Sequence, residues 1–528
     1  MLSGNADKAH PPARATVPDP DAAQQVLHFD VLVVGAGLSG ICAAYHLQAS
    51  CPGKRYAILE GREAIGGTWD LFRYPGVRSD SDMYTLGFSF RPWRSDKSIA
   101  AGGAILEYIR DTARAFDIER HIRFGHRATR ASWSSETARW TVEAAVGPRG
   151  EPARFTCNFL YLCSGYYDYA DGYMPGWPGM ERFGGRVVHP QHWPEDLAYD
   201  GKRVVVIGSG ATAVTLLPEM ARRAAHVTML QRSPTYIVAR PSSDAVSAWL
   251  QRKLPAGMAH RATRWKNVLF GMYFYNLARK KPELVKRKIL QAARAQLGPD
   301  YDIDKHFTPS YKPWDQRLCL VPDSDLFKSI RAGQASVVTD HIESFTETGL
   351  QLRSGQQLDA DIVVTATGLK LKVAGGMKIE VDGVPADPAQ AFMYKGMMYS
   401  DVPNLAVAMG YVNASWTLKA ELSSMYVCRL INHMDANGHA WCAPRRGGAA
   451  GDGEEPSLSL TSGYVQRASG ILPRQGRKRP WKVHQNYLFD LMALKFGKVE
   501  DGAMEFGRAG QPAPRMPAPA SAAESARG

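Results

Sequence analysis

Two glycine-rich turns are the residues of this sequence whose chemistry can be stated most directly. They are Gly35-Ala36-Gly37-Leu38-Ser39-Gly40 and Gly208-Ser209-Gly210-Ala211-Thr212-Ala213, and each joins an apolar stretch to a helical pattern. Glycine allows a tight turn and lets the backbone approach a pyrophosphate, and the N-terminus of the helix that follows favours the anion. The two turns therefore predict that one chain binds two dinucleotides.

The residues that end the next strand differ between the two turns. After the first turn, the strand at 56–59 ends in Glu60, whose carboxylate can accept hydrogen bonds from ribose hydroxyls. After the second turn, the strand at 226–230 continues into Gln231, Arg232 and Ser233. A carboxylate there would repel a 2'-phosphate, whereas a guanidinium can pair with it. We predict NADPH rather than NADH at the second turn, in preference to a merely solvated Arg232.

A third group of residues lies between the two turns, in the spacing F-x-G-x-x-x-H-x-x-x-W-P. It consists of Phe183, Gly185, His189 and Trp193, followed by Pro194. The glycine permits a close backbone approach, the histidine supplies an imidazole, and the indole is large enough to pack where two domains meet. The alternative is a surface loop in which the histidine and the tryptophan only pack.

Short apolar runs and helical patterns surround these residues and predict an α/β fold with two Rossmann-like units. The first unit is expected to contain strands at 29–34, 56–59, 122–124 and 159–163 and a helix at 41–47. The second is expected to contain strands at 203–207 and 226–230 and a helix that ends at 220. Two more strands are expected within 360–368 and 403–410.

Composition places the chain among ordinary globular proteins of more than one domain. It has 528 residues, of which 45% are hydrophobic and 22% charged, and a chain of this length exceeds one hydrophobic core. The net charge of +13 raises the question of nucleic acid, but no stretch interleaves basic and aromatic residues as nucleic-acid modules do. We therefore expect no nucleic-acid partner.

Cysteine usage argues against three classes of protein. The seven cysteines are scattered and odd in number and form no C-x-x-C pair, which argues against a disulfide framework, a zinc site or a flavin disulfide reductase, and for a reducing, cytoplasmic location. We predict no metal site. The N-terminus lacks the apolar region of a signal peptide, and no apolar run is long enough to span a membrane.

The third group and the stretch Gly66 to Asp80 resemble two patterns of the type I Baeyer-Villiger monooxygenases. The stretch reads G-G-x-W-x-x-x-x-[FY]-P-G-x-x-x-D. Members of this family are FAD- and NADPH-dependent enzymes that insert one oxygen atom of O2 beside a ketone carbonyl. Relatives that oxygenate nitrogen or sulfur usually have Tyr at the position of Trp193, so the resemblance favours ketones.

The resemblance also assigns residues to each cofactor. Contacts with FAD are expected at Gly35, Gly37, Ser39, Gly40, Glu60, Thr68, Trp69, Asp70, Leu71, Asp80 and Ala128. Contacts with NADPH are expected at Arg78, Ser79, Gly208, Ser209, Gly210, Ala211, Thr212, Ala213, Arg232 and Ser233.

Arg317 matches the active-site arginine of the family, and Asp80 is expected to orient it. The family's reaction needs an anionic oxygen nucleophile, and a guanidinium ~4 Å from such an anion, at an effective dielectric constant of ~20, contributes ~4 kcal/mol, or about three pKa units. The alternative is that Arg317 is one more phosphate contact.

The substrate class follows from a departure from the family pattern. The usual G-P after the last strand is replaced by Tyr411-Val412-Asn413-Ala414-Ser415-Trp416, which resembles the ethionamide-activating subgroup. We expect ketone and thioether or thioamide substrates together with O2. Two other readings stay open, an S- or N-oxygenating flavin monooxygenase and an NADPH oxidase or flavin reductase that releases peroxide.

The expected organisation combines these assignments. We expect a disordered tail at 1–27, a discontinuous FAD-binding domain at 28–164 and 365–445, an NADPH-binding domain at 165–240 and 315–364, a helical insert at 241–314 and a C-terminal extension at 446–528. Within the extension, 447–455 and the Pro/Ala-rich stretch after Gly510 are expected to be disordered.

The insert carries an excess of positive charge, and Glu283 is the only acidic residue among its basic ones. It could be a lid over the substrate site, a surface that touches anionic lipid, or a helical insert with a solvated basic face, and we favour the last. Its basic residues are Arg252, Lys253, Arg261, Arg264, Lys266, Arg279, Lys280, Lys281, Lys286, Arg287 and Lys288.

Overall fold

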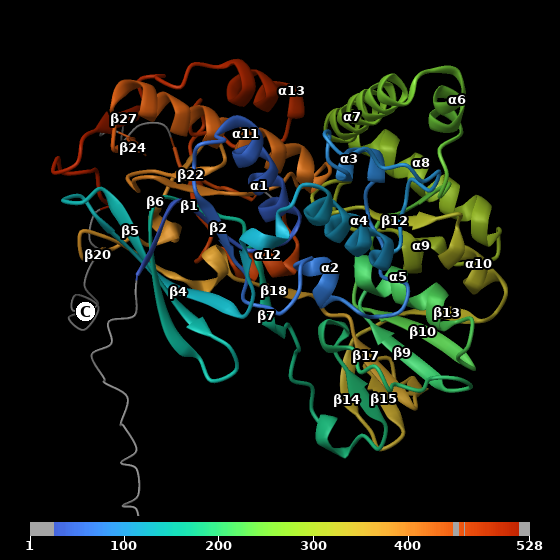
Figure 1. Ribbon diagram of the computed structural model, residues 1–528. Helices are drawn as coiled ribbons and strands as arrows, with labels where there is room; N and C mark the ends of the chain where they lie inside the picture. The colour runs from blue at the N-terminus through green and yellow to red at the C-terminus, as the bar shows by residue number, and fades with distance from the viewer. Residues whose placement is uncertain (1–25, 447–452, 459, 517–528) are drawn as a thin grey trace, which may run out of the picture.

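The computed structural model describes residues 26–446, 453–458 and 460–516. Its two largest sheets lie side by side, and each is flanked by helices (Figure 1). The predicted α/β class with Rossmann-like units is confirmed. Of the stretches predicted to be disordered, residues 1–25, 447–452 and 517–528 lie outside the described ranges. The predicted tail at 1–27 is wrong for Leu27, which begins strand β1.

The first sheet is built around strand β1 (Leu27–Val34), which pairs in parallel with β2 (Tyr56–Leu59) and β6 (Glu151–Leu162). The short strands β3 (Ile122–Arg123) and β23 (Leu405–Val407) extend this parallel part. One face packs on helices α1 (Leu38–Ser50) and α11 (Trp416–Asn437). Burial on both faces explains why β1 reads as a nearly continuous apolar run.

An antiparallel layer continues the first sheet. Strand β4 (His126–Ser134) pairs with β5 (Arg139–Val146), and β5 pairs with the first half of β6. Strands β19 (Lys378–Val381) and β20 (Val384–Pro385) complete the edge. Chain segments from before and after the second sheet thus belong to one sheet.

The second sheet has five parallel strands in the order β13-β10-β9-β17-β8. They are β13 (Ala335–Thr339), β10 (His226–Gln231), β9 (Arg203–Ile207), β17 (Ile362–Thr365) and β8 (Arg186–Val188). Helices α5 (Ala211–Met220) and α10 (Asp325–Arg331) pack on it.

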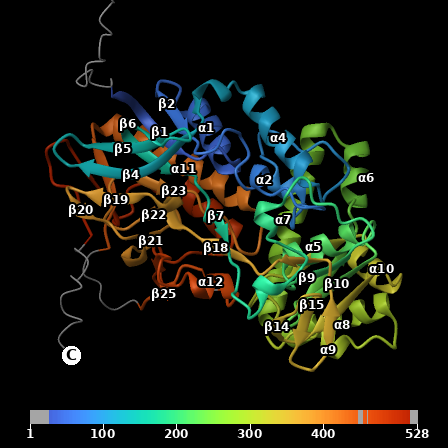
Figure 2. The ribbon, with the colours of Figure 1, turned by 90° about the horizontal axis from the view of Figure 1, so that it is seen from below.

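Two antiparallel strands connect the sheets. Strand β7 (Tyr167–Gly172) leaves the first sheet after β6, and β18 (Leu369–Leu371) returns from the second after β17. Figure 2 shows this pair between the two halves of the molecule. We call β7 and β18 the strap.

The helical insert lies between β11 (Ile237–Arg240) and β12 (Cys319–Pro322), which pair with each other. It contains α6 (Ala245–Lys253), α7 (Ala256–Lys280), α8 (Pro282–Leu297) and α9 (Ile303–Phe307). Helix α7 reaches across to α3 (Met83–Leu86), which precedes the second sheet in the chain.

The basic face of this insert is not solvated throughout, so the favoured interpretation is wrong for Arg264. Its side chain is 9% exposed and pairs with Glu421 of α11 at 2.8 Å. A second nitrogen of the guanidinium donates to the carbonyl oxygens of Tyr84, Thr85 and Gly87. This buried arginine joins the insert to the first half of the chain.

The C-terminal residues pack against the first half and do not form a separate unit. Strand β24 (Trp441–Pro444) pairs with β27 (Met504–Gly507). The disorder expected after Gly510 is wrong for the described residues 511–516, because Ala513 and Met516 are buried and the Ala513 amide donates to Ser135. Glu455, also expected to be disordered, lies in β25 (Glu455–Pro456), which pairs with β26 (Arg474–Gln475).

The remaining elements are short or lie at the periphery. They are α2 (Thr68–Leu71), α4 (Gly102–Ala115), β14 (Ile342–Phe345), β15 (Gly349–Leu352), β16 (Gln357–Asp359), β21 (Met393–Tyr394), β22 (Met398–Tyr399), α12 (Gly463–Arg467), α13 (Tyr487–Asp490) and the π-helical turn η6 (Leu491–Phe496). Short 3-10 helices occur at 119–121, 180–182, 190–192, 373–376 and 388–390.

The Arg264–Glu421 pair gives a stability prediction. Arg264→Ala should lower the free energy of unfolding by about 3–5 kcal/mol, because it leaves the Glu421 carboxylate buried without its partner. The matched control is the double variant Arg264→Met/Glu421→Met, which removes both charges and should lose much less. Urea unfolding of the two variants and the wild type measures the difference. Equal losses in both would show that packing, and not the charge pair, holds the insert.

Candidate active site

One large cavity lies between the two sheets and takes its walls from both. Its volume is about 1450 Å³, which exceeds the usual range for a pocket that holds a single small ligand. Both glycine turns border it, and so do residues of the strap and of the C-terminal extension.

The two glycine turns are built in the same way. Gly35 and Gly208 adopt φ angles of 104° and 134°, a region that favours glycine. A side chain at Gly35 would come within 2.6 Å of the Cys163 carbonyl oxygen, and one at Gly208 within 2.3 Å of the Ala366 carbonyl oxygen. Each turn is therefore pressed against the chain that leaves the neighbouring strand, and its backbone forms the cavity wall.

The later residues of the turns divide between wall and core. Gly37, Ser39, Ser209, Gly210, Ala211 and Thr212 border the cavity, whereas Gly40 and Ala213 do not. Gly40 has a packing role, because an added side chain there would meet the Gly35 carbonyl oxygen at 1.8 Å. Ala213 is fully buried in the core of the second half.

The residues that end the following strands also reach the cavity. The Glu60 carboxylate accepts the Ala36 amide at 2.7 Å and the Arg62 amide at 2.9 Å. Burial raises the pKa of Glu60, and these two amide bonds oppose the rise. Arg232 and Ser233 are exposed and border the cavity beside the second turn.

Helix α2, the loop after it and strand β4 place some of the predicted contacts at the cavity but not others. Thr68, Trp69, Asp80, Ala128, Arg78 and Ser79 border the cavity. The expectation that Asp70 and Leu71 face the flavin does not agree with their positions, since neither borders the cavity. Asp70 is buried, and its carboxylate pairs with Arg62, Arg73 and Arg110. Asp70 therefore stabilises α2 and the segments around it through these ion pairs.

Arg78 and Ser79 are each fixed by a neighbour. Arg78 pairs with Asp325 of α10 through one nitrogen, while its Nη2 atom is buried without a hydrogen-bond partner. The Ser79 hydroxyl accepts the Ala100 amide at 3.1 Å. The unpartnered guanidinium nitrogen is a donor that a bound anion or amide could satisfy.

Arg317 lies in the cavity wall beside Asp80, as the sequence predicts. Its Nη1 atom is 3.5 Å from the Asp80 carboxylate, and its Nη2 atom donates to the Tyr166 hydroxyl at 3.4 Å. Burial opposes the charge, but Tyr166, Tyr464, Tyr167 and Asp80 outweigh it and raise the pKa of Arg317 above its ordinary value. The Nε atom is buried and has no hydrogen-bond partner among the described residues, so it can donate a hydrogen bond to a ligand.

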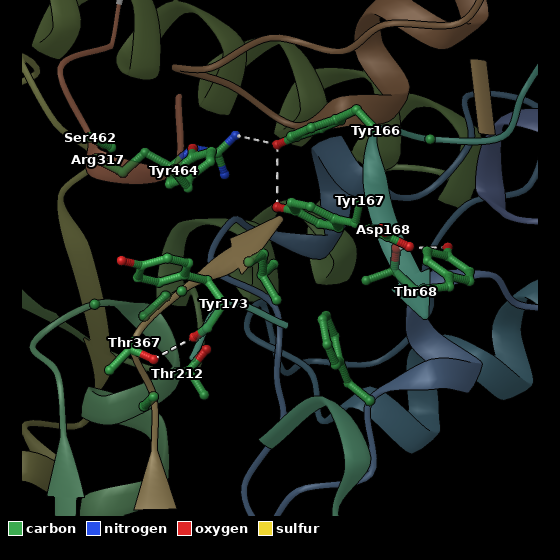
Figure 3. Close-up of a pocket in the computed structure, with 18 of the residues that line it drawn as sticks. Thr68, Tyr166, Tyr167, Asp168, Tyr173, Thr212, Arg317, Thr367, Ser462 and Tyr464 are labelled. Carbon is green, nitrogen blue, oxygen red and sulfur yellow. Dashed lines mark hydrogen bonds between the residues drawn. The ribbon is translucent and has the colours of Figure 1, made fainter. Parts of the chain in front are cut away.

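A wall of aromatic side chains connects Arg317 to the first glycine turn. The Tyr166 ring stacks on Trp416 with centroids 5.2 Å apart. The Trp416 indole donates to the Ser39 hydroxyl at 2.8 Å, and Tyr166 also hydrogen-bonds Tyr167 at 3.2 Å. Figure 3 shows Tyr166 between Arg317 and Tyr167. Through this series of contacts, the first glycine turn helps to fix the position of Arg317.

Several residues of this wall were not singled out from the sequence. The strap contributes Tyr167, and the residues on either side of β7 contribute Tyr166 and Tyr173. The C-terminal extension contributes Ser462 and Tyr464. Burial raises the pKa of Tyr464 to about 12 and that of Tyr167 well above its ordinary value, so both phenols are neutral donors. Tyr166 and Tyr167 could have been found from the run Y-Y-D-Y that follows a buried strand, because ligands bind at the carboxyl ends of strands.

The third group of predicted residues does not border the cavity. Phe183, Gly185, His189 and Trp193 lie behind the strap or in the core of the second half. The Gln191 side chain donates to the Asp168 carbonyl oxygen at 2.9 Å, and a His192 ring nitrogen is 2.9 Å from the Ala170 carbonyl oxygen. The segment therefore fixes the strap.

His189 shows most clearly how the segment holds the strap. A side chain on Gly172 would lie 1.9 Å from the His189 ring, so glycine is required where the imidazole rests on β7. Burial lowers the pKa of His189, which favours the neutral ring at neutral pH.

The residues present fit two dinucleotides. Two backbone turns, each in a conformation that excludes side chains, face one cavity from opposite sheets. Buried donor atoms of Arg78 and Arg317 have no partner within the described protein residues. Glycine turns of this kind hold pyrophosphates, and unpaired buried donors are typical of a ligand site.

Comparison with protein families and curated proteins gives consistent matches. Residues 87–434 match the flavin-binding monooxygenase-like family, and residues 33–95 match an NAD(P)-binding Rossmann-like domain. The FAD-containing monooxygenase EthA of Mycobacterium tuberculosis is 54% identical over 92% of this chain and 99% of its own length. The probable FAD-binding monooxygenase AlmA of Acinetobacter baylyi is 48% identical over 91% of this chain and 96% of its length.

Solved structures show the same fold at low sequence identity. An oxidized steroid monooxygenase bound to NADP has a TM-score of 0.73 and is 23% identical, covering 91% of this chain and 100% of its own. Cyclohexanone monooxygenase from Rhodococcus sp. Phi1 bound to NADP+ has a TM-score of 0.70 and is 19% identical, covering 92% and 100%.

The contact between His189 and the strap can be tested by filling it. Gly172→Ala should lower the free energy of unfolding by about 1–3 kcal/mol, because the added methyl group overlaps the imidazole. Gly176→Ala is the matched control, since it has open space around it. The double variant Gly172→Ala/His189→Ala should recover stability in thermal melts. A Gly172→Ala protein that melts with the Gly176→Ala control would contradict the contact.

Proposed function

The chain belongs to the flavin-binding monooxygenase-like family, and from that premise we propose that it oxidises ketones to esters or lactones with NADPH and O2. It is an FAD-containing monooxygenase with the fold of the Baeyer-Villiger enzymes. Its substrate is a small molecule. Thioethers or thioamides are the second substrate class that we propose, because the curated relatives include EthA and because the stretch 411–416 departs from the usual pattern.

We assign the two halves to the two cofactors. Residues 28–164 and 365–445 hold FAD at the first turn, residues 165–240 and 315–364 hold NADPH at the second, and 241–314 form the insert. The acidic Glu60 after the first turn and the basic Arg232 after the second support this assignment of FAD and NADPH. No helix among the described residues is long and apolar enough to cross a membrane. The seven buried free thiols support a cytoplasmic enzyme.

The observation that carries the proposal is the position of Arg317. When bound, reduced FAD supplies an activated form of O2 that transfers one oxygen atom to the substrate. Arg317, with Asp80 at 3.5 Å and Tyr166 at 3.4 Å, holds a fixed positive charge toward the cavity. Such a charge stabilises an anionic oxygen nucleophile without reorganisation at the moment of reaction.

Product analysis decides between this function and its alternatives. The purified FAD-loaded enzyme is reduced with NADPH without oxygen, mixed with O2 and offered a panel of ketones and thioethers, and the products are identified by mass spectrometry. Esters or lactones support the proposal. S- or N-oxides alone favour a heteroatom oxygenase. Hydrogen peroxide equal to the NADPH consumed identifies an oxidase.

Arg317 is expected to separate reduction from oxygen insertion. Arg317→Ala should still bind FAD and consume NADPH but make no ester, because only the second step needs the anionic nucleophile. Arg317→Lys should recover little, since an ammonium lacks the planar fork that contacts both Asp80 and Tyr166. The measurement is ester formed per NADPH consumed. Near wild-type ester formation by Arg317→Ala would reduce Arg317 to a structural or phosphate-binding residue.

Arg232 is expected to determine the choice of nicotinamide cofactor. Arg232→Ala should weaken NADPH binding by about 1.5–3 kcal/mol and leave NADH binding nearly unchanged, since only NADPH carries the 2'-phosphate. Arg222→Ala is a suitable control, because this exposed arginine of the same half pairs with Glu219 and does not border the cavity. Binding titrations with both nucleotides test the prediction, and equal losses for both would refute it.

A further inference from the structure

Exposed apolar side chains gather on one side of the molecule. Of the thirteen large hydrophobic residues that are exposed among the described residues, seven lie on α6 and α7 and three on α13 and η6. Single exposed apolar residues are normal, but a cluster marks an interaction surface. We call this the apolar face and define it by Trp249, Trp265, Leu269, Tyr273, Met492 and Phe496.

Helix α7 has an apolar stripe that is packed along one edge and exposed along the other. Trp265, Leu269 and Tyr273 follow one another at intervals of four residues and are 40%, 50% and 65% exposed, so they form one line along the helix. Val268 and Met272 lie along one edge of this line and pack with Tyr411 and Leu418. The exposed line is therefore additional to the edge that holds the helix in the fold.

The turn after α13 continues this face. The Trp265 ring meets the Tyr487 ring edge to face at 5.8 Å, which places α13 beside α7, as Figure 1 also shows. Met492 and Phe496 are 60% and 61% exposed. Two segments far apart in the sequence therefore lie side by side, and both carry exposed apolar side chains.

Positive charge surrounds the apolar face. Arg252 and Lys253 end α6, Arg261 precedes Trp265 by one helical turn, Lys280 and Lys281 follow Tyr273, and Lys495 and Lys498 flank Phe496. Within α6, α7, α8, α13 and η6 the acidic residues are Glu283 and Asp490, and Asp490 is buried against Lys419 at 2.7 Å. The rim is therefore mainly positive, although Asp244 caps α6 and the exposed Glu500 follows Lys498.

We propose that the apolar face docks the enzyme on an anionic lipid surface. An amphipathic helix with aromatic residues on one side and lysine and arginine at its borders lies in the interface of a bilayer, where the rings enter the headgroup region and the cations pair with phosphates. A second copy of this chain would bring two rims of positive charge together, which disfavours self-association through this face. Attachment is peripheral.

Docking would place the cavity near the lipid. Tyr411 borders the cavity and packs against Val268 on the packed edge of α7. A lipophilic substrate dissolved in the bilayer would then lie one helix away from the cavity wall. The docking inference itself does not depend on the proposed reaction, because its residues belong to the insert and the C-terminal extension.

The test is co-sedimentation of the FAD-loaded full-length enzyme with vesicles. We expect binding to phosphatidylcholine vesicles that contain phosphatidylglycerol, little binding to phosphatidylcholine alone, and a loss of binding at high salt. Trp265→Ser/Tyr273→Ser should weaken binding by more than about tenfold, because two buried aromatic side chains are lost from the interface. Arg261→Glu/Lys280→Glu should also abolish the preference for anionic lipid.

Matched controls keep the proposal open to refutation. Met174→Ser/Ile471→Ser changes two exposed apolar residues elsewhere, and Arg149→Glu changes an arginine whose side chain is 87% exposed elsewhere. Both should bind vesicles like the wild type. Equal binding to both vesicle types, or equal loss in the controls, would overturn the proposal. So would a dimer in solution that the Trp265→Ser/Tyr273→Ser variant dissociates while its vesicle binding is unchanged, because the face would then join two copies.

Discussion

The antiparallel pairing of β7 with β18 is the constraint on which the remainder of the structure depends. Each glycine turn belongs to its own sheet, and the strap is a connection between the sheets that passes through the cavity region. If the strap moved, the two turns would no longer face one cavity. The residues 189–192 contact β7 from outside, through the His189 ring and the side chains of Gln191 and His192. The segment 189–192 does not border the cavity, but through these contacts it holds the strap that forms part of the cavity wall.

A second constraint links the first turn to the reactive region. Ser39 accepts the Trp416 indole, Trp416 stacks on Tyr166, and Tyr166 accepts a hydrogen bond from Arg317. These four residues come from four separate segments, so the position of the arginine depends on packing across the whole first half. Trp416 lies in the stretch that departs from the usual family pattern, so a change in this stretch would reach Arg317 through these contacts.

The sequence predicted the parts of the fold that local patterns determine. The strands at 56–59 and 203–207 were predicted with the bounds that the structure has, because buried parallel strands read as short apolar runs. Arg317 and Asp80 were expected beside each other and lie 3.5 Å apart. In contrast, Asp70 was expected to face the flavin because it stands inside a motif, and a motif does not say which of its residues turn inward.

The features that the sequence could not predict depend on contacts between distant segments. Arg264 was counted with a solvated basic face because its partner Glu421 lies in a helix far along the chain. Tyr464 reaches the cavity from the extension, where no local pattern distinguished it. The residues 511–516 have the composition of a disordered tail, yet Met516 is buried in the core of the first half.

The central claim is that one chain couples NADPH oxidation to the insertion of an oxygen atom from O2 beside a carbonyl. Its most direct test is the reaction of the FAD-loaded enzyme with NADPH and a ketone under ¹⁸O2, with mass spectrometry of the product. The account predicts an ester that carries one ¹⁸O atom in its ring or chain oxygen for each NADPH consumed. Unlabelled product, or unreacted ketone with hydrogen peroxide equal to the NADPH consumed, would contradict it.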